Sequence, residues 1–152
     1  MASLRQTFAH NLRRLREERG WSQDDLAERL HTDRTSISRI ERLAPNVALD
    51  KVAQSAVALG VDARQLLSTG IHSVRTGPTH HGVSPSPQLV GAAVRRLREA
   101  GDISQRQLGD RVGLDRNHIS RIEMGSTNIA LDTLEKVATA LGVAASDLLS
   151  HK

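Results

Sequence analysis

The sequence predicts an all-α protein that consists of two five-helix modules joined by a flexible linker. Two observations support this fold class. Apolar residues recur along the chain at the 3.6-residue period of an amphipathic helix, and no segment alternates as a β-strand would. In addition, residues 8–68 align with residues 90–150 without a gap, and 29 of the 61 aligned positions are identical. A match of this length indicates two copies of one module.

Three segments divide the chain: a first module over residues 1–68, a linker over 69–87 and a second module over 88–152. Two copies are too few for a stacked solenoid, so we expect each module to fold around its own core. The linker contains three of the four prolines, three glycines and three histidines, which are His72, His80 and His81. No Cys, Asp or Glu accompanies these histidines in the linker, so the sequence predicts no metal site there. We also expect no cofactor.

Within each module the apolar periodicity predicts five short helices in the same order. In the first module their apolar positions fall within residues 8–15, 26–30, 37–40, 49–59 and 61–67. In the second module the apolar positions fall within residues 90–97, 108–112, 119–122, 131–141 and 143–149. Capping signals precede the second and third helices. These signals are the pairs Ser22 with Asp25 and Ser104 with Gln107, and the single residues Asp33 and Asp115.

The joint between the second and third helices is short. In the second module, Gly113 can end one helix in the left-handed conformation, and Asp115 can start the next. Two short helices joined by a turn of three to four residues form a helix-turn-helix.

Composition and charge exclude several classes of protein. The chain of 152 residues has no cysteine, and therefore no disulfide framework and no thiolate metal site. No apolar run approaches the roughly 18 residues of a membrane span, and residues 1–20 carry charges where a signal peptide would be apolar. We therefore expect a cytoplasmic protein with no membrane partner. Its charged residues are 21 basic and 17 acidic, so the net excess is small.

The third helix of each module predicts a function. Ile37 and Ile40, like Ile119 and Ile122, mark its buried side. The remaining surface of these helices carries Arg34, Thr35, Ser38, Arg39 and Arg42 in the first module, and Arg116, Asn117, His118, Ser120 and Arg121 in the second. A charged helix face of this kind often has no role beyond contact with solvent. However, Arg can bond bidentately to guanine and Asn to adenine, and the face follows a tight turn twice, which favours readout of double-stranded DNA.

Three strings make a family resemblance specific: S-Q-x-x-L-A from Ser22, I-S-R-I-E from Ile37 and A-L-G-V from Ala58. With them, the chain resembles the lambda-repressor/Cro-type (XRE) helix-turn-helix family along most of both modules. The resemblance implies lambda-repressor-like domains whose third helix enters the major groove. It also implies that Gln23 and Gln105 contact phosphate or brace the first base contact. Finally, it implies structural ion pairs between helices one and three, formed by Arg16 with Glu41 and by Arg98 with Glu123.

The first module departs from the second at its turns. His31 replaces Gly113, Leu43 replaces Gly125, and Pro45 changes the following loop. A side chain in the left-handed region costs about 1–2 kcal/mol, so we expect the first module to be less stable or to have a reshaped loop. Two further residues, Asn46 and Asn128, either contact phosphate or cap the fourth helix.

Together these features predict a sequence-specific regulator of transcription that acts as a repressor on a DNA operator. The modules differ at Thr35 and Asn117, so the two half-sites should be related but unequal, with adenine under Asn117. Half-sites one turn apart, about 34 Å, lie within the linker's reach. Homodimerisation through the later helices stays open. The alternative is an antitoxin or adaptor that uses one module for protein binding or dimerisation and the other for DNA. No enzyme motif is present in the sequence, so we do not expect catalysis.

Overall fold

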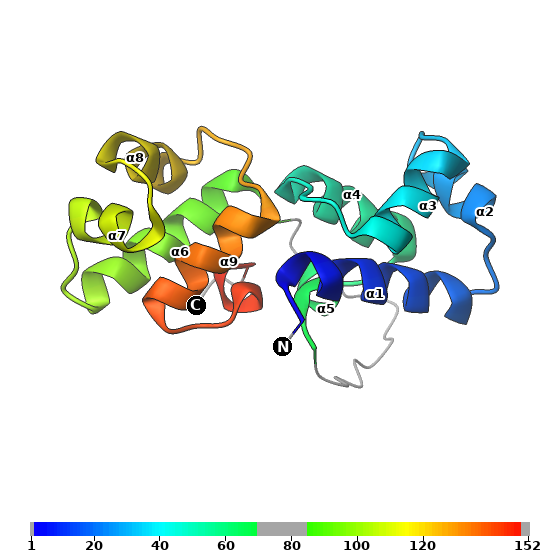
Figure 1. Cartoon of the computed structure of the whole chain (residues 1–152), viewed down its shortest axis with the longest axis horizontal. Coiled ribbons are helices and arrows are strands. Elements are labelled where there is room, and N and C mark those ends of the chain that lie inside the picture. The colour runs from blue at the N-terminus through cyan, green and yellow to red at the C-terminus, as the bar shows by residue number, and fades with distance from the viewer. Residues whose placement is uncertain (1, 70–84, 150–152) are drawn as a thin grey trace.

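The structure is a computed structural model that describes residues 2–69 and 85–149. Every regular element in these ranges is helical, so the predicted all-α fold is confirmed (Figure 1). The first module contains α1 (Leu4–Glu18), α2 (Gln23–Arg29), α3 (Arg34–Leu43), α4 (Leu49–Leu59) and α5 (Ala63–Leu67). The second contains α6 (Pro87–Ala100), α7 (Gln105–Val112), α8 (Arg116–Met124), α9 (Leu131–Leu141) and a 3₁₀ helix, η1 (Ala145–Leu149).

The helices begin where side chains satisfy their first free backbone N–H groups. The predicted caps are confirmed: Ser22 and Ser104 form capping boxes, and the carboxylates of Asp33 and Asp115 accept from backbone N–H groups three residues on. Ser3 forms a further capping box with Gln6 at α1, which the periodicity alone did not indicate.

The second module differs from its prediction at both ends. Pro87, expected in the linker, is the first residue of α6, because proline suits the first turn of a helix where no N–H partner is needed. The expected fifth α-helix is the 3₁₀ helix η1.

In the first module the buried Asn11 amide donates to the carbonyls of Gln65, Leu66 and Ser68 at the end of α5. The second module has Ala93 at the equivalent position, which offers no such donor.

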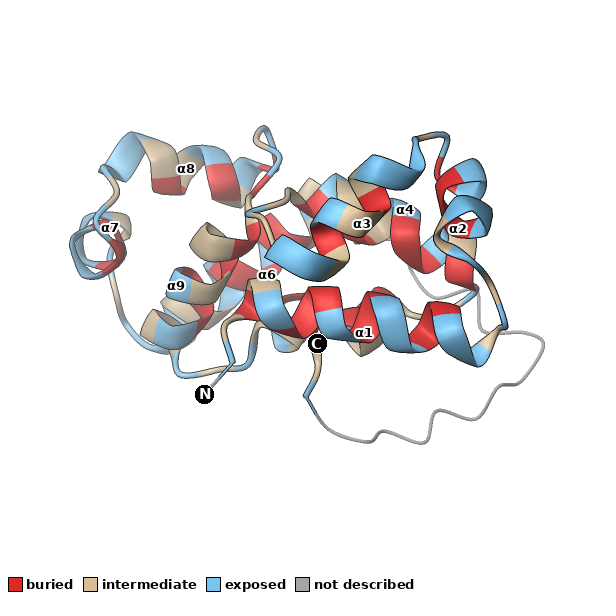
Figure 2. Cartoon of the chain, turned by 45° about the vertical axis from the view of Figure 1, so that its right-hand side comes forward, coloured by how far each residue is buried: buried red, intermediate tan, exposed pale blue. Residues whose placement is uncertain are grey.

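The two modules share one hydrophobic core, which corrects the expectation of two separate cores. Leu12, Leu26 and Ile37 are fully buried in the first module, and the predicted apolar sides of the helices point inward (Figure 2). The buried residues of both modules belong to a single contiguous cluster. Contact between α5 and η1, and between α1 and α9, joins the two halves of this cluster. The modules are therefore docked against each other.

The turns that follow α2 and α3 in the first module adopt left-handed conformations without glycine. His31 has a φ of 54°, close to the 74° of Gly113 at the equivalent place. After the third helix the modules diverge: α8 ends at Gly125, whereas α3 continues through Leu43 and the left-handed residue is Ala44, with a φ of 45°. The loop of the first module is thus reshaped, as the sequence predicted.

The linker's predicted flexibility and its histidines His72, His80 and His81 fall outside the described residues. Within residues 2–69 and 85–149, no three His, Asp or Glu side chains are placed to hold a metal ion. No helix in these ranges is both long and apolar enough to cross a membrane.

The strained turn at His31 leads to a stability prediction. His31→Gly should raise the free energy of unfolding by about 0.5–1 kcal/mol, because glycine adopts a positive φ without steric cost. Gly113→Ala is the matched change in the second module and should lower stability by about 1 kcal/mol, since open space surrounds its new Cβ and only φ opposes it. Denaturant unfolding of the full chain measures both. A lower midpoint for His31→Gly would contradict the assignment of strain.

Candidate nucleic-acid interface

A buried ion pair holds the third helix of each module against the first. Arg16 Nε on α1 lies 2.7 Å from Glu41 Oε1 on α3, and the two side chains are 10% and 4% exposed. In the second module Arg98 donates to both oxygens of Glu123, each at 2.9 Å. Both ion pairs implied by the family resemblance are therefore present. Hydrogen bonding to Glu123 raises the pKa of the Arg98 guanidinium.

The same arginines also satisfy the loop that leads into the second helix. Arg16 Nη1 donates to the carbonyl of Trp21 at 2.7 Å, and Arg98 Nη1 donates to that of Ile103 at 2.8 Å. One guanidinium thus ties together helix one, helix three and the connection to helix two. This arrangement fixes the orientation of α3 and α8 relative to their modules.

Gln23 and Gln105 open the second helices, α2 and α7, as expected. Gln23 Nε2 donates to Glu41 Oε2 at 2.7 Å, so its amide braces the ion pair. Gln105 lies half-buried at the matching position. Contact of either glutamine with DNA stays a prediction.

The structure places the ten predicted residues on the outer surface of α3 and α8. Ser38, His118 and Ser120 are half-buried. Arg34, Thr35, Arg39, Arg42, Arg116, Asn117 and Arg121 are exposed. Ile37 and Ile119 are fully buried on the opposite side, as predicted. Hydrogen-bonding groups of the kinds that read base edges therefore face outward from both helices.

The arginines of this surface differ from those of α1 and α6 in their partners. On α1 and α6, Arg13, Arg14 and Arg95 each pair with a glutamate four residues on. The opposite charges of each pair largely cancel. On α3 and α8, none of the five guanidinium groups has an ion-pair or hydrogen-bond partner among the described residues. These five are Arg34, Arg39, Arg42, Arg116 and Arg121. Their positive charge is available to a phosphate or a base.

Carboxylates near these arginines are engaged elsewhere. Glu41 and Glu123 point inward to the ion pairs, and Asp33 caps the start of α3. The hydrogen bond from the Ser36 backbone N–H lowers the pKa of the Asp33 carboxyl. Because this pKa is lowered on folding, the cap stabilises the protein above the carboxyl's unfolded pKa and loses this effect as the pH falls through the folded value.

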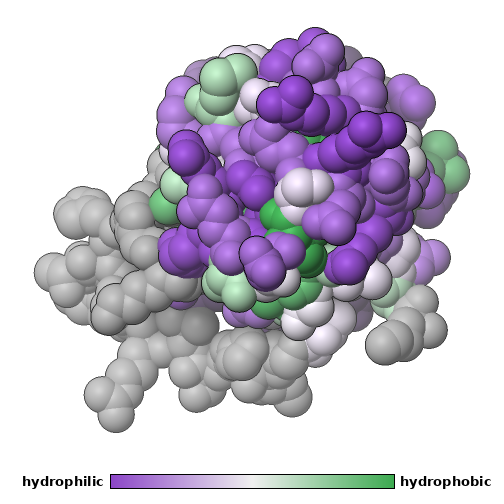
Figure 3. Space-filling model, turned by 90° about the vertical axis from the view of Figure 1, so that its left-hand side faces the viewer, coloured by the Kyte–Doolittle hydropathy of each residue, from purple (hydrophilic) through white to green (hydrophobic). Residues whose placement is uncertain are grey.

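The end of the molecule that carries α7 and α8 presents a mainly hydrophilic surface (Figure 3). Only Met124 on α8 is a large exposed apolar side chain there, among the described residues. A surface of this composition suits a polar, charged ligand better than an apolar one.

Asn46 and Asn128 take the second of the two roles considered for them, in an unexpected form. Asn46 Oδ1 accepts from the backbone N–H of Asp132 in the first turn of α9, at 3.0 Å. Asn128 Oδ1 accepts from that of Asp50 in the first turn of α4, at 3.2 Å. Each asparagine therefore caps the fourth helix of the other module. Contact with phosphate through the remaining amide group is untested.

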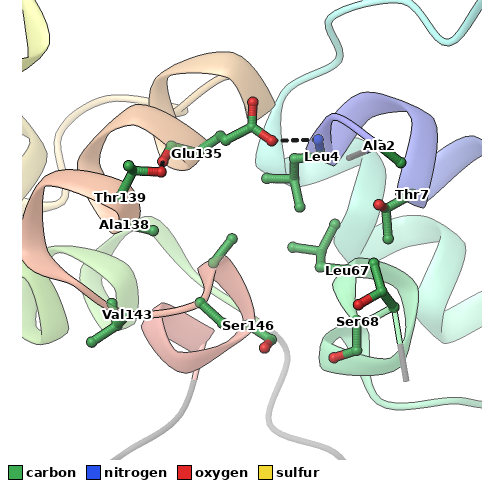
Figure 4. A pocket seen from close by; sticks show the side chains of 13 residues that line it. Ala2, Leu4, Thr7, Leu67, Ser68, Glu135, Ala138, Thr139, Val143 and Ser146 are labelled. Carbon is green, nitrogen blue, oxygen red and sulfur yellow. Dashed lines mark hydrogen bonds between the residues drawn. The ribbon is translucent and has the colours of Figure 1, made fainter. Parts of the chain in front are cut away.

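A second set of contacts between the modules has no counterpart when the equivalent residues of the two modules are exchanged. Glu135 on α9 accepts a hydrogen bond from the backbone N–H of Leu4 at the start of α1 (Figure 4). Arg5 Nε lies 3.0 Å from Asp132 Oδ1, as an ion pair without hydrogen-bond alignment. A cavity of about 400 Å³ lies beside the Glu135 contact, between α1 and α5 on one side and α9 and η1 on the other.

The sequence did not indicate these one-sided contacts. Arg5 aligns with Pro87, and Glu135 aligns with Ala53, so the repeat itself carries no matching pair. The absence of a counterpart is the only sequence signal that could have drawn attention to Arg5 and Glu135.

Comparison with known families covers both modules. Residues 7–68 match the family described as "Helix-turn-helix domain", and residues 94–148 match the family described as "Helix-turn-helix". Each match includes the ion pair and the exposed third helix of its module.

Individual relatives match one module's length. A hypothetical transcription factor of Neisseria meningitidis serogroup B is 47% identical over 64 residues, which cover 42% of this chain and 60% of the relative. The control protein C.BamHI of Bacillus amyloliquefaciens is 44% identical over 62 residues, which cover 40% of this chain and 76% of the relative. The solved structure of the Neisseria transcription factor NHTF matches at 45% identity and a TM-score of 0.42, over 43% of this chain and 76% of that one. This chain thus spans less than two thirds of the length of the first of these relatives.

The buried ion pair leads to a second stability prediction. Glu123→Ala should lower the free energy of unfolding by about 3 kcal/mol, because it leaves the buried Arg98 guanidinium without its counter-charge. The control is Glu99→Ala, which breaks an exposed pair on α6 and should cost about 0.5 kcal/mol or less. Chemical denaturation of both variants measures the difference. Equal losses would refute a structural role for the Arg98–Glu123 pair.

The asparagine caps lead to a third stability prediction. Asn46→Ala and Asn128→Ala should each lower stability by about 1 kcal/mol, because each removes an N-terminal cap from the other module. Gln54→Ala, which removes an exposed amide from α4, serves as the control and should leave stability unchanged. If the asparagine variants unfold at the wild-type midpoint, the caps do not contribute as the geometry implies.

Proposed function

This chain belongs to the lambda-repressor/Cro-type (XRE) helix-turn-helix family of DNA-binding transcriptional regulators, and on that premise we propose that it is a repressor that reads two related half-sites of an operator. In this proposal α3 and α8 enter the major groove, one at each half-site. The protein acts by occupying promoter DNA, in the cytoplasm on the nucleoid. It needs neither a cofactor nor a catalytic site.

One observation carries the proposal: the five arginines on α3 and α8 have no partner among the described residues, while those of α1 and α6 are largely paired. Exposed arginines without a partner in the protein can bond to phosphate and guanine, which accept two parallel hydrogen bonds from one guanidinium. The chain's net charge of only +4 makes strong non-specific binding unfavourable. Specificity therefore comes from the side chains that reach the bases.

Individual roles follow from position and chemistry. Arg39 and Arg121 occupy equivalent places in the two helices and would each bond to a guanine. Asn117 would bond to an adenine, whereas Thr35 at the matching place would contact a different base or a thymine methyl. The outward-facing Arg34, Ser38, Arg116, His118 and Ser120 complete the base-reading set. Arg42, Gln23 and Gln105, with the free amide groups of Asn46 and Asn128, would position the helices on phosphates.

The roles of the two arginines can be tested directly. Arg39→Ala and Arg121→Ala should each weaken binding of the full chain to its selected operator by about 10- to 100-fold, because each removes a bidentate base contact. Arg64→Ala is the control: it removes the same charge from α5, where Arg64 pairs with Asp62, and should have little effect. Fluorescence anisotropy at a fixed salt concentration measures all three.

The outcomes separate the proposals for the two modules. If only Arg121→Ala weakens binding, the first module does not read DNA. If both variants match Arg64→Ala, neither helix reads bases and the proposed function fails. Transcription in vitro from a promoter that overlaps the operator should fall when the protein is added. A rise would instead indicate an activator.

A further inference from the structure

One set of contacts between the modules is reciprocal. Beyond the two asparagine caps, Ala48 and Ala130 form an antiparallel bridge. Beside it, Leu49 N–H donates to the carbonyl of Ile129 at 2.8 Å, and Leu131 N–H donates to that of Val47 at 2.9 Å. Every one of these contacts is repeated when each residue is exchanged with its counterpart 82 positions away. Such an exchange defines a local two-fold axis through the centre of the molecule.

The same axis relates the two reading helices. α3 and α8 occupy equivalent positions in their modules, and both lie on the upper side of the molecule in Figure 1, on either side of the contact between modules. Two DNA-reading helices related by a two-fold axis face the DNA in opposite directions, so their half-sites are inverted relative to each other. A direct repeat would require a translation without rotation, which the docked arrangement does not provide.

The docked arrangement is built for two unlike modules. Glu135 accepts from the N–H of Leu4, but the equivalents of these residues are Ala53, which has no carboxylate, and Ser86, which is itself a helix cap. Two first modules would therefore lack the Glu135 contact. Two second modules would lack the Arg5 pair with Asp132, since Pro87 replaces Arg5. Only the pairing of first with second module forms both contacts, and one chain contains that pairing.

We infer that a single docked chain binds an inverted pair of unequal half-sites at one fixed spacing. This inference rests on the proposed function and adds orientation, spacing and stoichiometry to it. Two undocked modules joined by a flexible linker would accept direct and inverted repeats at several spacings, because the linker would span them all. The docked pair accepts one arrangement. Because Asn117 and Thr35 differ, the chain also sits on its operator in one direction only.

The experiment is in vitro selection by the full chain from random-sequence duplexes of roughly 40 base pairs, about four helical turns. Enrichment of two unlike motifs, inverted and at a single spacing, is the expected result. Moving the motifs apart by half a helical turn, about 5 base pairs, or turning one of them round should then weaken binding by about 100-fold. Light scattering of the complex should give one chain per duplex.

Other results overturn the inference in distinguishable ways. Two motifs at several spacings, or in both orientations, would mean that the modules bind undocked, while the proposed function would stand. Two chains per duplex would mean that a second copy of the chain supplies the helix that reads the second half-site. Absence of any enriched motif would refute the proposed function itself. Selection with Arg121→Ala identifies the half-site of the second module: the expected result is loss of that motif alone, and an unchanged pair of motifs would contradict the assignment.

Discussion

The buried pair of arginine and glutamate between helices one and three is the interaction on which the site depends. Arg16 and Arg98 each bind a glutamate of the third helix and a carbonyl of the loop before the second. Two charges are withdrawn from water here, and their burial is tolerated only while they are paired. The third helix therefore cannot rotate or slide without leaving a charge buried and uncompensated. A reading helix needs this rigidity, because base recognition depends on side chains that arrive in a defined register.

The same pairing shapes the electrostatics of the outer surface. The glutamate in each third helix points inward to its arginine, which leaves arginine as the charged residue type on the exposed side of α3 and α8. On α1 and α6, by contrast, exposed arginines such as Arg13 lie four residues before a glutamate and are paired locally. A nearly neutral protein thereby presents positive charge at two places. This distribution favours specific over non-specific attraction to DNA.

Docking of the two modules adds a constraint that neither module has alone. The caps of Asn46 and Asn128 are reciprocal, because each asparagine satisfies a helix end in the other module. Separate modules would have to restrict their relative motion on binding DNA, at a cost in entropy. Modules already held in place avoid that cost and limit the arrangements of DNA they can accept. The one-sided contact of Glu135 with α1 then distinguishes the two halves of an otherwise symmetric unit.

The sequence by itself determined the order of the helical elements, the caps at Ser22, Ser104, Asp33 and Asp115, and the outward face of the third helix. These features depend on residues within about one helical turn of each other, so the period and the capping chemistry carry them. Tertiary structure alone decided the partners of Asn46, Asn128, Arg5 and Glu135, the common core and the relation between the two reading helices. Those contacts join residues up to 131 positions apart, and no local pattern specifies which distant surface a side chain meets.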